Sequence, residues 1–135
     1  MKLINSLMLV LLTAAVFGQN SLTVRVEGIE EVKGEIEFCL FDNDEDFMYK
    51  AVSCTYLPVN SKSTSYQFTN ITAKDYAVVI YHDLNDNRDL DTGWMNIPTE
   101  PYGFSNNPST RFGPPNFKKA SFTVDGDKEI SISLN

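Results

Sequence analysis

The chain has 135 residues and carries 18 acidic against 11 basic side chains, which gives a formal net charge of −7. A chain with this balance lacks the basic stripe that binding to a phosphate backbone requires, so nucleic acid is excluded as a partner. The length suits one domain with a hydrophobic core of its own.

Residues 1–18 have the pattern of a secretory signal peptide. Lys2 supplies the positive charge, an apolar run follows it, and the small residue Gly18 precedes Gln19. The run is too short for a retained span, and no cysteine follows the cut that would indicate a lipid anchor. We expect cleavage after Gly18 and a single β-sandwich domain over residues 19–135 with no membrane span, secreted or periplasmic.

Short segments that alternate apolar and polar residues fill most of the mature chain. Alternation with period two is typical of half-buried strands. The most apolar segment predicts a central strand, and the sequence Asp125-Gly126-Asp127 predicts a hairpin between the last two strands. The expected strands cover residues 22–26, 35–41, 51–59, 65–68, 76–81, 118–124 and 129–134. Seven such strands predict an all-β fold, a seven-stranded antiparallel β-sandwich with one long ordered loop.

Cys39 and Cys54 both lie in the exported part, where an oxidising environment permits a disulfide. Alternation places Glu37 and Cys39 on one face of their strand, and an antiparallel neighbour that contains Cys54 would turn the two sulfurs toward each other. Closing a loop of about fifteen residues would stabilise the fold by roughly 3 kcal/mol in the chain-entropy model. The alternative is two unrelated small apolar side chains. A redox role is not expected without a C-x-x-C pair.

A first acidic cluster, residues 42–47, follows the strand that contains Cys39. Asn43 or Asp44 would cap a helical turn there, and the carboxylates after the cap would be favoured by the helix dipole. The alternative is that this cluster lends a ligand to the second acidic loop.

That second loop follows the most apolar strand and places side-chain oxygens at every second position. A D-x-[DN]-x-[DN] spacing lets a curled backbone aim several oxygens at one hard cation such as calcium. Crowded carboxylates repel one another, and a bound divalent ion would turn that repulsion into attraction. The candidate metal ligands are Asp83, Asn85, Asn87, Asp89 and Asp91.

The match to the twelve-residue calcium loop is partial. Arg88 occupies the sixth position, where the sharp turn uses glycine, and Trp94 occupies the twelfth, where a glutamate normally binds in bidentate fashion. We therefore expect no helix–loop–helix site and only weak calcium binding, around 10⁻⁴ to 10⁻³ M. The alternative is a metal-free turn, because Asp and Asn side chains readily bond their own backbone.

The residues around and after this loop resemble a known family. The features in common are His82-Asp83, Leu90-Asp91, Ile97-Pro98, a GFSNN block at 103–107 and an FGPP block at 112–115. Over about residues 22–134 the chain resembles the bacterial domain-of-unknown-function family 2141. The resemblance implies an exported β-sandwich, immunoglobulin-like or transthyretin-like, with no established activity. Members tend to have glycines inside the asparagine turn, where this chain has Asp86 and Arg88.

Residues 92–117 are rich in proline and aromatic side chains. Disordered linkers are poor in aromatics, so we expect an ordered loop, and ordered loops of this length are usually functional. One interpretation is that the aromatics plug the end of the sandwich. The other is that Trp94, Tyr102 and Phe104 form a ligand surface, on which a glycan or an extended peptide stacks.

The inventory of catalytic groups is thin. His82 is the single histidine, at the end of a buried strand, and neither a G-x-S-x-G nor an H-E-x-x-H motif is present. Glu100 has no carboxylate partner at a fixed spacing. We expect a non-enzymatic binding or accessory module with a cation-stabilised acidic loop and an unknown protein or carbohydrate partner. The alternatives are a structural cell-envelope protein without a ligand, and a hydrolase that uses His82 and nearby carboxylates.

Overall fold

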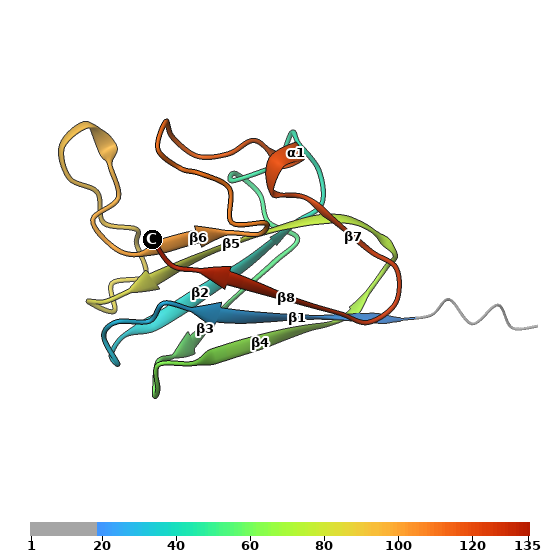
Figure 1. Cartoon of the computed structure of the whole chain (residues 1–135), viewed down its shortest axis with the longest axis horizontal. Coiled ribbons are helices and arrows are strands. Elements are labelled where there is room, and N and C mark those ends of the chain that lie inside the picture. Colours follow the sequence, from blue (N-terminus) through green and yellow to red (C-terminus); the bar gives the residue numbers. More distant parts are fainter. Residues whose placement is uncertain (1–18) are drawn as a thin grey trace, which may run out of the picture.

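Eight strands form two sheets in the computed structural model, which describes residues 19–135 (Figure 1). The predicted signal peptide lies outside these described residues. The strands are β1 (Asn20–Glu27), β2 (Glu35–Phe41), β3 (Ser53–Pro58), β4 (Thr64–Ile71), β5 (Lys74–Asp83), β6 (Tyr102–Phe104), β7 (Phe122–Val124) and β8 (Lys128–Ser133). The helical segments are a 3-10 turn, η1 (Trp94–Asn96), and a single α-helical turn, α1 (Phe117–Ala120). In the described part of the chain, no helix is long and apolar enough to cross a membrane.

The smaller sheet has the order β4-β1-β8, and the larger has the order β3-β2-β5-β6, with β7 paired to the other end of β5. The predicted all-β, two-sheet architecture is therefore confirmed, and β5 is central as expected. Two details of the prediction were wrong. The strands number eight, because β6 forms inside the stretch expected to be loop, and β1 runs parallel to β8, so the sandwich is not wholly antiparallel.

The end of the chain also differs from the prediction. β7 pairs with β5 whereas β8 pairs with β1, so the turn at Gly126 carries the chain from one sheet to the other and does not make a hairpin. The expected strand over residues 118–124 begins as α1 instead. Asn116 caps that turn, since its side-chain oxygen accepts a hydrogen bond from the Lys119 amide at 2.9 Å.

The main core lies between the two sheets and is built from alternate residues of the strands. Alternate side chains of β1 and β2 are at most 1% exposed, which is the two-residue period seen in the sequence. A second, smaller cluster lies on the outer face of the larger sheet, where segments between strands fold back over it. Its buried members are Phe41, Phe47, Ala77, Phe104 and Ala120.

The predicted disulfide is present. Cys39 on β2 and Cys54 on β3 are directly paired across the strands, with 4.2 Å between their Cα atoms.

The first acidic cluster, residues 42–47, forms the capped turn expected of it, because the side-chain oxygen of Asn43 accepts a hydrogen bond from the Asp46 amide at 2.9 Å. Asp42 of that cluster pairs with Lys74 at 2.9 Å rather than with the second acidic loop.

Candidate functional site

The acidic loop, residues 83–91, is organised around the buried carboxylate of Asp83. This side chain is fully buried at the end of β5. Its two oxygens accept hydrogen bonds from the backbone amides of Asn87, at 3.3 Å, and Arg88, at 2.6 Å. Asp83 thus folds the loop back over the end of its own strand.

Glu100 holds the two ends of the acidic loop together. Its carboxylate is 6% exposed and accepts hydrogen bonds from the backbone amide of Leu84, at 3.0 Å, and from that of Asp91, at 3.1 Å. Sequence reasoning searched for a carboxylate partner of Glu100 and missed this role, because the partners are backbone amides that carry no sequence signal.

The remaining predicted ligands bond mainly to one another and to the loop backbone. Asp91 accepts hydrogen bonds from the side-chain amides of Asn85, at 2.5 Å, and Asn87, at 2.9 Å. The side-chain oxygen of Asn87 accepts from the Asp89 amide at 2.9 Å. Asp and Asn side chains that bond one another and the local backbone in this way are typical of tight turns.

The predicted ligand set is only partly brought together. Asp91 lies with the two asparagines, whereas Asp83 forms a close group with Glu35 and Asp86, in which one oxygen of each lies within 4.8 Å of the others. Glu35 also receives the Arg88 guanidinium, 3.2 Å away. Calcium binding by this loop stays a prediction.

Asp86 and Arg88 adopt the left-handed backbone conformation, with φ of 54° and 56°. This region favours glycine, because a Cβ atom there crowds the backbone. Within the acidic loop, residues 83–91, these are the two positions with positive φ. Arg88 has a use that glycine would lose, since its guanidinium lies 4.5 Å from the centre of the Tyr56 ring.

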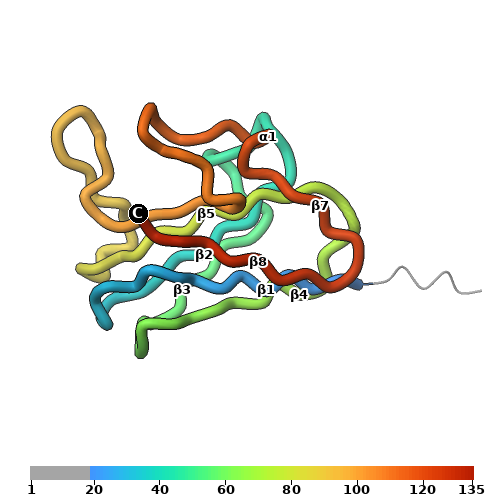
Figure 2. Tube along the Cα trace, viewed as in Figure 1, coloured from blue at the N-terminus to red at the C-terminus, as the bar shows by residue number. Residues whose placement is uncertain are grey.

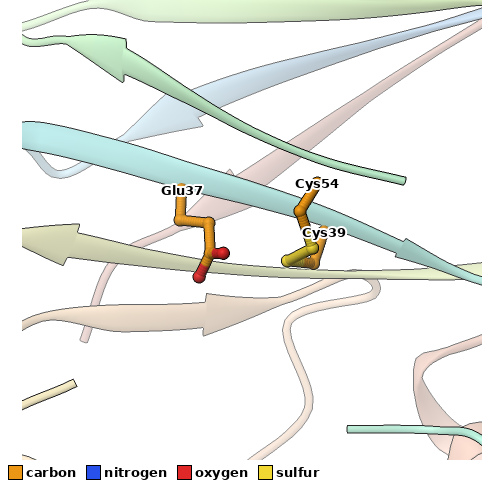
Figure 3. A group of neighbouring side chains, drawn as sticks. All are labelled: Glu37, Cys39 and Cys54. Atoms are coloured by element: carbon orange, nitrogen blue, oxygen red, sulfur yellow. A yellow bond between two sulfur atoms is a disulfide. The ribbon is translucent and has the colours of Figure 1, made fainter. Parts of the chain in front are cut away.

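Glu37, Cys39 and Cys54 form the other close group of possible metal ligands in residues 19–135 (Figure 3). Both sulfurs are joined in the disulfide, so neither is available as a thiolate ligand. Glu37 is thus the one member of this group that is left as a possible ligand.

His82 points into the core and is 1% exposed. Its Nε2 donates a hydrogen bond to the backbone carbonyl of Lys33 at 2.7 Å. That contact ties β5 to the turn before β2, near Gly34, where an added Cβ would lie 2.0 Å from the Asp83 carbonyl oxygen.

Two arms stand off the outer face of the larger sheet, and Figures 1 and 2 show them beyond β5 and β6. The first arm, residues 92–98, is a miniature hairpin in which Gly93 donates to the Ile97 carbonyl at 2.8 Å and Thr92 bridges to Pro98. Its tip turns through two residues with positive φ, Met95 and Asn96. The second arm, residues 108–115, follows β6.

A groove of about 500 Å³ lies between the arms. Its floor includes Val79, Tyr81, Tyr102 and Phe104 from β5 and β6, which places two of the three predicted ligand-surface residues there. Trp94 is not part of the lining and is 83% exposed at the tip of the first arm. The aromatics of this stretch are thus divided, because some pack onto the sheet while Trp94 stays in solvent. The walls are formed by Met48, Leu90, Thr92, Met95, Asn96, Ile97, Pro98, Thr110, Arg111, Gly113 and Pro114.

Polar side chains continue the floor toward the sheet edge. Strand register places Tyr56, Glu37, Tyr81 and Tyr102 in one row across β3, β2, β5 and β6. The hydroxyls of Tyr56 and Tyr81 are 3.3 Å apart. Burial raises the pKa of the Glu37 carboxyl, and the two neighbouring hydroxyl groups oppose that rise.

The GFSNN block holds β6 and the second arm to the rest of the fold. Ser105 is buried, accepts from the Val78 amide at 2.9 Å and donates to the Ala120 carbonyl. Asn106 donates to two carbonyls beside α1. Asn107 accepts from the Ser133 amide at 2.8 Å and donates to the Ser131 carbonyl, which ties the two sheets together beyond β6.

Fold and site together define a disulfide-bonded, two-sheet β protein with a preformed apolar groove outside the larger sheet. A family model described as "Uncharacterized protein conserved in bacteria (DUF2141)" matches residues 24–133, and the chain belongs to this family. No curated protein and no solved structure matches it.

Proposed function

We propose that the chain is an exported, non-enzymatic binding module that holds an extended, apolar segment of a protein partner in the groove between its two arms. The observation that supports this most directly is the groove itself. Its volume of about 500 Å³ is in the range of ligand pockets, and its lining is mostly aliphatic and aromatic.

The rims of the groove extend the apolar surface well beyond the floor. Trp94 and Ile97 on the first arm are 83% and 59% exposed, and Phe112 on the second arm is 96% exposed. Soluble proteins seldom leave large apolar side chains clustered in solvent unless a partner covers them. Exposure on two opposed arms suits a ligand that runs between them and is longer than a single sugar ring.

The arms are held in place before any ligand arrives. The first is closed by its own hydrogen bonds and by Glu100 at its base, and the second is held through the GFSNN block. A preformed site loses less conformational freedom on binding, so more of the contact energy appears as affinity.

Several further parts of the proposal rest on more general support. The enclosure of His82 and its bond to Lys33 favour a structural role over a hydrolytic one. The N-terminal sequence pattern and the disulfide favour export to an oxidising compartment, secreted or periplasmic. An immunoglobulin-like or transthyretin-like sandwich is the closer fold type that we propose for the two sheets.

Calcium remains a separate proposal for the acidic loop. What supports it is charge: four carboxylates lie between Asp83 and Asp91 with one guanidinium among them. Asp91 now accepts hydrogen bonds from the side-chain NH₂ groups of Asn85 and Asn87. To bind calcium, both asparagines would have to turn their amide oxygens toward the ion instead. That rearrangement is one reason to expect weak affinity.

The groove can be tested by panning a random peptide display library against the full chain produced in an exporting bacterial host. We expect enrichment of peptides with two or more apolar residues, and loss of their binding to Ile97→Arg, which places a charge on the exposed rim. Val32→Arg is the matched control, because Val32 is 48% exposed and is not part of the groove lining. No enrichment, or enriched peptides that bind Ile97→Arg as well as wild type, would refute the proposal. A glycan array tests the carbohydrate alternative on the same variants.

A further inference from the structure

The carboxylate of Glu37 lies next to the groove floor and lacks a cation. Glu37 is the cross-strand neighbour of Tyr81, and Tyr81 lines the groove. Side chains directly opposite each other on one face of a sheet have Cβ atoms about 5 Å apart, so a ligand side chain on Tyr81 is within reach of Glu37.

No basic side chain among residues 19–135 makes an ion pair with Glu37, whereas four other carboxylates each have one. The guanidinium of Arg88 is held over the Tyr56 ring and bonded to Glu35. Glu37 is half-buried, and a half-buried carboxylate loses hydration that a cation would restore.

The surroundings are also negative. Glu35 lies two residues before Glu37 on β2, and it pairs across the strands with Asp83, where the acidic loop begins. Arg111 is the single charged residue of the groove lining, and it lies on the second arm. The charge beside Tyr81 is therefore negative, since Glu37 and, two residues earlier on the same strand, Glu35 are both carboxylates.

We propose that the protein segment bound in the groove carries a lysine or arginine beside its apolar residues, and that Glu37 binds this basic side chain while Val79, Tyr102 and Phe104 hold the apolar ones. The inference rests on the proposed function, because it names the chemistry of the partner at the same site. The hydroxyls of Tyr56 and Tyr81, its two cross-strand neighbours, both hydrogen-bond to the carboxylate.

The peptides enriched on the wild-type chain provide the test. We expect lysine or arginine at one position in most of them. Glu37→Gln should weaken their binding about tenfold, a change typical of a close, partly desolvated charge pair. Glu27→Gln is the matched control, since it makes the same acid-to-amide change on an exposed strand residue of the smaller sheet outside the groove lining, and it should leave binding unchanged.

A double-mutant cycle separates a direct contact from a general effect of charge. Replacing the basic residue of one enriched peptide by methionine should weaken its binding to wild type and have little effect on binding to Glu37→Gln. Enriched peptides that are neutral or acidic, or equal losses with both forms of the protein, would overturn the inference. Neutral peptides that still lose binding to Ile97→Arg would overturn it while leaving the proposed function intact.

Discussion

Replacing Glu100 by glutamine tests how the acidic loop is held. The carboxylate accepts one backbone amide on each oxygen and is 6% exposed. Glutamine keeps one accepting oxygen and replaces the other by an NH₂ group, which cannot accept and faces a backbone N–H donor. A hydrogen bond to a charged group contributes about 1.5–3 kcal/mol, so we expect Glu100→Gln to lower the free energy of unfolding by about 2–3 kcal/mol.

For a domain of this size, each kcal/mol changes the melting temperature by roughly 3–6 °C, so the expected decrease is roughly 6–18 °C. Thermal unfolding followed by circular dichroism would measure it, with urea unfolding as a second probe. Asp89→Asn is the matched control, because it makes the same acid-to-amide change in the same loop on an exposed side chain. We expect it to stay within about 0.5 kcal/mol of wild type. A Glu100→Gln variant as stable as Asp89→Asn would refute the role assigned to Glu100.

Four further predictions concern the loop, the disulfide and Glu37. At calcium concentrations ten times the dissociation constant, the free energy of unfolding should be about 1.4 kcal/mol higher than in chelator, and Asp89→Asn should reduce that difference. Equal unfolding midpoints with millimolar calcium and with chelator would rule out the site. Asp86→Gly should stabilise the chain by about 0.5–1 kcal/mol in urea unfolding, because glycine removes the left-handed strain at that position. Changing Cys39 and Cys54 together to serine should cost about 3 kcal/mol, and intact mass of the wild-type chain should show no free thiol. Burial raises the pKa of Glu37, so the ionised carboxylate is less stable in the folded state than in the unfolded state. The free energy of unfolding of the wild type should therefore fall relative to that of Glu37→Gln as pH rises through the range in which carboxyl groups ionise. Parallel pH profiles of the two proteins would contradict this.

The strands that the sequence predicted correctly have one face in the core between the sheets and the other face outside it. In β2, Ile36 and Phe38 enter the core while Glu37 and Cys39 face outward, so alternation of side chains records the environment directly. The same register made the disulfide predictable, because the face of Cys39 and the direction of the next strand together fix where a partner must lie.

The errors arose where distant packing decides the structure. β6 has three residues and a glycine in the middle, so it has no periodic signal. Gly103 is needed because a Cβ there would lie 2.7 Å from Ile132 and from the Ser133 carbonyl oxygen on β8. The turn at Gly126 has the local chemistry of a hairpin, yet local chemistry does not state which sheet the next strand joins.

The candidate site was predictable in part for the same reason. Regular spacing identified the acidic loop, and aromatic content identified Tyr102 and Phe104 as surface candidates. The groove depends on two arms whose positions are set by Glu100 and Asn107, each of which bonds to backbone groups that could belong to any residue. Such contacts leave no pattern in a single sequence.

The acidic loop is connected to the groove through the hydrogen bonds that hold the first arm. Glu100 fixes Asp91, and Asp91 accepts two hydrogen bonds from Thr99 through its carbonyl, which closes the base of the first arm. Weakening that base frees the arm that forms one wall of the groove. Glu100→Gln should consequently reduce peptide binding even at temperatures where the protein is fully folded, although Glu100 does not line the groove. The acidic loop then contributes to binding indirectly, because it holds the first arm in place with or without a bound cation.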